Sequence, residues 1–163
     1  MLRSIGLRGS LASGDISALL SVQRSYSSLS SDTAGWHGLL DELRSYYSNV
    51  TPQALSVLGQ IASDPTGRVD LRSAAAGALA RMHTREALPF LAVLLDDPSQ
   101  DLRAIASGGI ASFANNLPMG SHQPATGPWP YRTPETIARA TFEARHAPFW
   151  KAWWQENRTK LIQ

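Results

Sequence analysis

Two stretches of the chain decide its fold: DLRSAAAGALAR at Asp70–Arg81 and DLRAIASGGIAS at Asp101–Ser112. They begin 31 residues apart, and both have an Asp-Leu-Arg start, a run of small residues and a following aliphatic residue. A second similar pair lies upstream, ALSVLGQIASDP at Ala54–Pro65 and ALPFLAVLLDDP at Ala87–Pro98. Self-similarity at this period is typical of stacked helical hairpins, because each hairpin buries its apolar face against the next one.

The upstream pair carries the start and stop signals of a helix. Thr51 is a favourable N-cap, and Pro52 stands at the first helical position, where its missing amide costs nothing. Asp64-Pro65 ends the predicted helix, because the residue before a proline is disfavoured in the α region. Between them lies an apolar stripe at helical spacing: Leu55, Leu58, Ile61 and Ala62.

The Asp-Leu-Arg stretches predict the second helix of each hairpin. We expect Asp70 to be an N-cap, where its carboxylate accepts bonds from free amides. Small residues at 74–77 and 108–109 predict close approach to a neighbouring helix. The residues expected to face inward are Leu71, Ala75, Ala78, Leu79 and Met82. The apolar seam expected between hairpins consists of Leu55, Leu58, Leu79, Leu88, Leu91 and Ile110.

Residues 51–117 resemble the HEAT-repeat family, in the short form of bacterial HEAT-like proteins and phycobilisome lyase-type repeats. The resemblance is carried by Asp64-Pro65 with DLRSAAAGAL and by Asp97-Pro98 with DLRAIASGGI. The family's second helix opens with an aliphatic–arginine pair, here Leu71-Arg72 and Leu102-Arg103. The resemblance implies an all-α fold, an α-α superhelix of helical hairpins with capping helices at both ends.

The flanks of the repeats predict those caps, in a repeat domain over residues 32–163. An amphipathic pattern covers about residues 33–49, and Thr133-Pro134 starts the C-terminal capping helices, residues 133–161. The tail PFWKAWWQENRTKL resembles the C-terminal part of uncharacterised bacterial HEAT-repeat proteins. Its aromatic residues stand so close in sequence that one of them must stay partly exposed: Phe149, Trp150, Trp153 and Trp154.

Composition narrows the partners and the compartment. Residues 1–31 are rich in Ser and Arg and nearly free of acids, which predicts a flexible segment or an organellar transit peptide. That segment accounts for the net charge of +2, so the remaining chain is neutral and lacks the basic field expected of a nucleic-acid binder. No apolar run approaches the roughly 20 residues of a membrane-spanning helix.

The sequence contains no constellation typical of catalysis. The chain has no cysteine, its four histidines are scattered, and no glycine-rich phosphate loop or Gly-x-Ser-x-Gly turn is present. We therefore predict no metal site and no cofactor. A non-catalytic protein–protein interaction or scaffolding module is the favoured function. The alternative is a nucleic-acid-processing or small-ligand-binding enzyme that uses the C-terminal tryptophan cluster, since aromatic platforms stack on bases.

Two features are candidate binding elements. The connection at 115–132 holds four prolines and two glycines, and such long connections are often functional. It is either a binding loop or a lid packed over an apolar seam, with Trp129 as its main contact. Arg72 and Arg103 either hold an acidic partner or pair with nearby aspartates in a ladder between repeats. The candidate binding residues are Arg72, Arg103, Asn115, Asn116, His122, Trp129 and Arg132.

Overall fold

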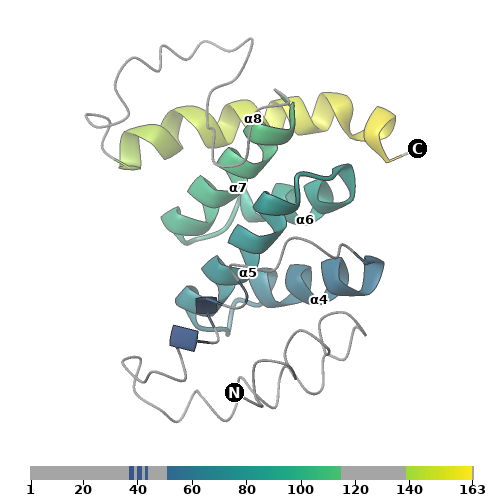
Figure 1. Ribbon diagram of the computed structural model, residues 1–163. Helices are drawn as coiled ribbons and strands as arrows, with labels where there is room; N and C mark the ends of the chain where they lie inside the picture. The colour runs from purple at the N-terminus through teal and green to yellow at the C-terminus, as the bar shows by residue number, and fades with distance from the viewer. Residues whose placement is uncertain (1–36, 39, 42, 44–50, 115–138, 163) are drawn as a thin grey trace. The chain divides into compact units, whose positions relative to one another are not determined.

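In the computed structural model, every regular secondary-structure element among the described residues is a helix (Figure 1). The described residues are 37, 38, 40, 41, 43, 51–114 and 139–162, and none of them lies in a strand. No helix among them is long and apolar enough to cross a membrane. The prediction of an all-α fold is therefore confirmed for this part of the chain. Its helices are α4 (Pro52–Ser63), α5 (Val69–Met82), the short 3-10 helix η1 (Arg85–Ala87), α6 (Leu88–Leu94), α7 (Gln100–Ala114) and α8 (Arg139–Leu161).

The chain divides into two compact units, Met1–Ala78 and Leu79–Gln163. In the first unit, α4 begins and ends where its capping signals predict. The hydroxyl of Thr51 accepts a hydrogen bond from the amide of Ala54 at 3.1 Å, and Pro52 occupies the first helical position. The helix stops at Ser63, and Asp64 is extended. The predicted stripe is confirmed as the buried face of α4: Leu55, Leu58, Ile61 and Ala62.

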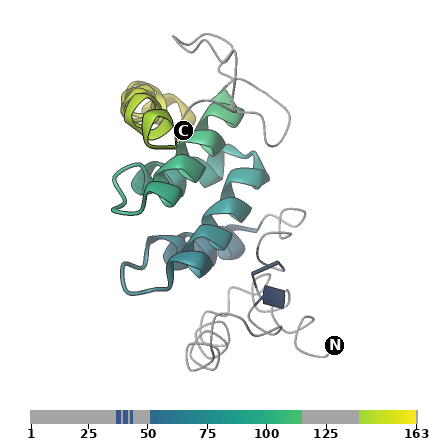
Figure 2. The same ribbon diagram turned by 90° about the vertical axis from the view of Figure 1, so that its left-hand side faces the viewer.

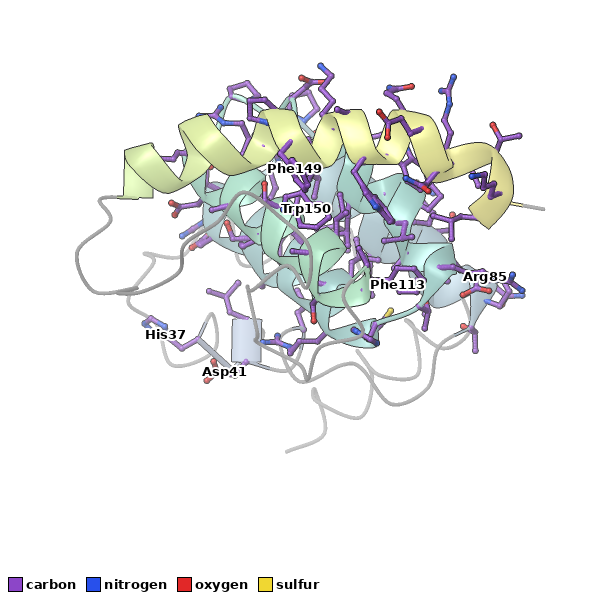
Figure 3. The ribbon with its side chains drawn as sticks, turned by 90° about the horizontal axis from the view of Figure 1, so that it is seen from above. His37, Asp41, Arg85, Phe113, Phe149 and Trp150 are labelled. Carbon is purple, nitrogen blue, oxygen red and sulfur yellow. The ribbon has the colours of Figure 1, made fainter. Side chains whose placement is uncertain are left out.

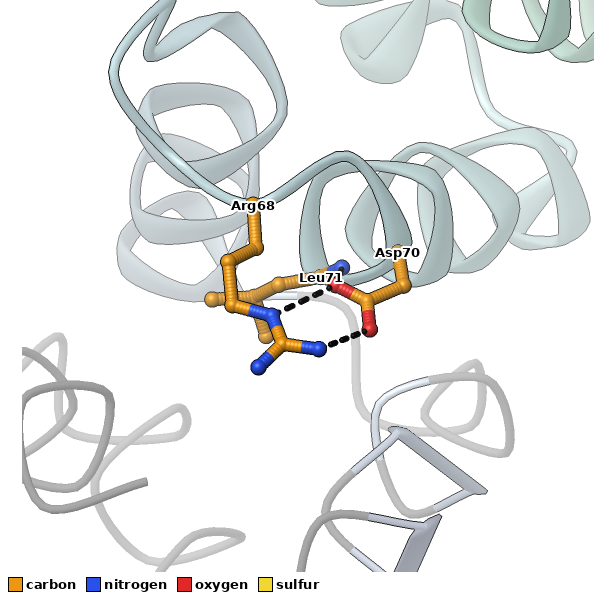
Figure 4. Close-up of polar contacts among 3 residues, drawn as sticks. All are labelled: Arg68, Asp70 and Leu71. Carbon is orange, nitrogen blue, oxygen red and sulfur yellow. Dashed lines mark hydrogen bonds and ion pairs between the residues drawn. The ribbon is translucent and has the colours of Figure 1, made fainter. Parts of the chain in front are cut away.

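The start of α5 differs from the prediction. The helix begins at Val69, so Asp70 lies in the first turn and is not the N-cap. Its carboxylate is held by the guanidinium of Arg68, from Nε at 3.2 Å and from Nη2 at 2.8 Å (Figure 4). The amide of Leu71 also donates to Asp70 Oδ1, at 2.9 Å. These bonds hold the Asp70 carboxylate over the first turn. The residues expected to face inward from this helix are all buried, which confirms that prediction: Leu71, Ala75, Ala78, Leu79 and Met82.

In the second unit, α7 packs against both α6 and α8, and α8 lies across it (Figures 1 and 2). The close approach predicted for the glycines of α7 is confirmed at Gly109. A Cβ placed there would lie 2.7 Å from the Cβ of Ala80 and 2.9 Å from Cδ1 of Leu91. The largest side chains with almost no exposed surface in this unit are Leu79, Leu88, Leu91, Leu94, Leu102, Ile110 and Trp150.

Helix α8 has a buried, a half-buried and an exposed side between Ala147 and Trp154. Ala147, Trp150 and Trp154 are buried, at the spacing of one helix face. Phe149 and Trp153 flank this face and are half-buried. Pro148 lies inside the helix on its exposed side. The expectation that one residue of the aromatic cluster stays partly exposed is therefore confirmed.

Candidate interaction surface

The same kind of turn follows α4 and α6, and each of these two turns is called a corner below. After α4, Oδ1 of Asp64 accepts a hydrogen bond from the amide of Thr66 at 2.9 Å. After α6, Oδ1 of Asp97 accepts one from the amide of Ser99 at 2.8 Å. An aspartate that bonds the amide two residues ahead forms an Asx turn, which reverses the chain over a few residues. The Asp-Pro pairs therefore repeat in geometry as well as in sequence.

An arginine of the following helix completes each corner. Nε of Arg72 donates to the carbonyl of Ala62 at 3.0 Å, and this carbonyl lies in the last turn of α4. Nη1 of Arg103 donates to the carbonyl of Asp97 and, at 2.9 Å, to that of Pro98. The last four carbonyls of a helix have no partner within it, and cations are favourable at that negative end of the helix dipole. Arg72 therefore bonds the end of α4, whereas Arg103 bonds the turn that follows α6, and each arginine ties its own helix to the preceding backbone.

The two arginines differ in exposure. Arg72 is only 5% exposed, whereas Arg103 is half-buried. The positive charge of Arg72 also contributes to the environment of Asp64. Hydrogen bonds from the hydroxyl and amide of Thr66 lower the pKa of Asp64 below its ordinary value of 3.8, and the Arg72 charge adds to this effect against partial desolvation. Arg72 thus belongs to the interior of the corner, and Arg103 reaches its surface.

Arg103 belongs to a charged cluster at the turn between α6 and α7. We define the turn cluster as Asp96, Asp97, Pro98, Arg103 and Lys151. Nζ of Lys151, in α8, lies 2.6 Å from Oδ1 of Asp96, and both side chains are exposed. Because Arg103 bonds the same turn from α7, the turn cluster connects three successive elements of the second unit.

The aromatic side chains of α8 pack edge to face, and Figure 3 labels two of them, Phe149 and Trp150. The ring centroids of Phe149 and Trp150 are 4.8 Å apart at 89°, and those of Trp150 and Trp153 are 5.8 Å apart at 70°. Such geometry stabilises a packed core. Trp150 is 2% exposed and Trp154 is 8% exposed, so the faces of these two indoles are covered.

His83 has a structural role that its position in the sequence did not indicate. It follows α5 with a φ of 51°, in the left-handed region that often terminates helices. Its Nε2–H donates to the carbonyl of Ser112 at 2.9 Å, in the last turn of α7, and its ring lies 5.9 Å from that of Phe113. His83 therefore ends one helix and caps another.

The remaining predicted binding residues lie outside the described part of the structure: Asn115, Asn116, His122, Trp129 and Arg132. Their placement beside Arg103 stays a prediction. Among the residues that the structure does describe, no three His, Cys, Asp or Glu side chains are grouped so that they could hold a metal ion.

No protein-family model, no curated protein and no solved structure matches the chain. The resemblance to HEAT repeats therefore rests on the sequence motifs within residues 51–117.

Proposed function

We propose that this protein is a non-catalytic protein–protein interaction or scaffolding module of the HEAT-repeat type, built as an α-α superhelix with capping helices. The observation that carries the proposal is that the same kind of turn occurs after α4 and after α6. Asp64 and Asp97 make the same Asx turn, and an arginine of the next helix bonds the preceding backbone in both hairpins. Repetition of one hairpin unit favours an array, and arrays provide extended binding surfaces without a reaction centre.

The proposed contact surface is the exposed part of the turn cluster, together with the predicted loop at 115–132. Asp96 and Lys151 are exposed, and Arg103 is partly exposed. Charged and polar groups suit the polar rim of a protein interface, and arginine is enriched among interface residues in general. The burial of Arg72 and its bond to Ala62 support a structural role for that residue instead.

The burial of two tryptophans supports this function over the enzymatic alternative. An aromatic platform must offer an open ring face to a base or a sugar. Trp150 and Trp154 are covered, and Trp153 alone of the three is half-buried. This arrangement is what a terminal helix needs to seal the end of a core.

Co-purification with a tagged full-length chain tests the proposal, with wild type compared to Arg103→Ala and Arg72→Ala. Each substitution removes an arginine that bonds the backbone preceding its own helix, so Arg72→Ala is the control for a loosened corner. We expect a stoichiometric protein partner with wild type, and about tenfold weaker binding of that partner by Arg103→Ala, a loss of about 1.4 kcal/mol.

Under the proposal, Arg72→Ala retains the partner at temperatures where circular dichroism shows it folded. Two results would contradict the proposal. One is a wild-type chain that recovers no stoichiometric partner. The other is a loss of partner that follows the unfolded fraction equally in both variants, which would limit Arg103 to its structural role.

A further inference from the structure

We draw no further inference here: the strongest candidate, the half-buried aromatic stripe that Phe149 and Trp153 form along α8, is an apolar helix face, and nothing in the described structure shows what covers it.

Discussion

Gly109 and Ala80 approach so closely that a methyl group on Gly109 would lie 2.7 Å from the Cβ of Ala80. The Leu91 side chain, 2.9 Å from the same position, could rotate away, but the Cβ of Ala80 moves only with its backbone. The helices that carry Gly109 and Ala80 are therefore held at a separation that only glycine permits.

We predict that Gly109→Ala destabilises the protein by about 1–3 kcal/mol, because overpacking outweighs the gain of up to about 1 kcal/mol in helix propensity. Gly38→Ala is the matched control, since Gly38 is helical and exposed and has nothing within 4 Å of the added methyl. Urea unfolding measures both variants. A Gly109→Ala protein as stable as Gly38→Ala would show that the helices can separate without cost.

The buried Arg72 gives a second prediction. Arg72→Ala leaves the carbonyl of Ala62 without this donor in a buried place, and we expect a loss of about 1–3 kcal/mol in the free energy of unfolding. Arg158→Ala, at an exposed position of α8, should change stability by less than about 0.5 kcal/mol. Equal effects of the two substitutions in chemical denaturation would rule out a stabilising role for the bond between Arg72 and Ala62.

Lowering the pH should destabilise the turn after α4, because it protonates the carboxylate of Asp64. The pKa of Asp64 is lowered in the folded protein by its bonds with Thr66, so the charged carboxylate stabilises the fold. This contribution is fully present above the ordinary pKa of 3.8 and is lost as the pH falls through the lowered folded value. Asp64→Asn keeps an acceptor for the amide of Thr66 but removes the titration.

We therefore expect the free energy of unfolding to fall less for Asp64→Asn than for wild type between about pH 5 and about pH 2. Thermal unfolding across that range measures the difference. Glu156→Gln, at an exposed position of α8, controls for the change in net charge. Parallel curves for wild type and Asp64→Asn would mean that the Asx turn carries no charge-dependent stability.

Trp150 and Trp153 should contribute unequally to the free energy of unfolding, because only Trp150 is fully buried. We predict that Trp150→Ala costs about 3–5 kcal/mol and leaves a partly unfolded protein, because it empties a buried site in α8. Trp153→Ala should cost clearly less, since its side chain is half-buried. Near-ultraviolet circular dichroism and urea unfolding measure both variants, and a larger loss at Trp153 would reverse our assignment of the buried face.

Single-stranded nucleic acid should not bind to this cluster. The rings of Trp150 and Trp154 are covered, so we expect no saturable change in tryptophan fluorescence when a single-stranded oligonucleotide is added at about 0.15 M salt. Trp153→Phe removes the one partly exposed indole of the three and is the matched variant. Saturable quenching in wild type that disappears in Trp153→Phe would favour the nucleic-acid function over the scaffold.

The sequence predicted those parts of the fold that depend on neighbouring residues. Thr51-Pro52 and Asp64-Pro65 set the ends of α4, because capping and proline sterics act within a few residues. The small residues of α7 indicated the contact at Gly109, since glycine inside a helix usually serves packing.

The partners of polar side chains were harder to predict, whether they are near or distant in the sequence. Asp70 is not the cap because Arg68 and the Leu71 amide hold its carboxylate within the helix that starts at Val69. The direction of the Arg72 side chain depends on a carbonyl ten residues earlier, and that of His83 on one twenty-nine residues later. Sequence spacing offers several partners for such long polar side chains, and only the packed helices select one of them.

The corners have a consequence for how such a chain evolves. Each Asp-Pro corner is closed by residues within one short stretch of sequence, Ala62–Arg72 for the first and Asp97–Arg103 for the second. A duplicated gene segment of that length would bring its own bend with it, and insertions would be tolerated between corners more readily than inside them. A duplication that includes residues 97–103 would therefore copy the bond from Arg103 together with the turn that it closes.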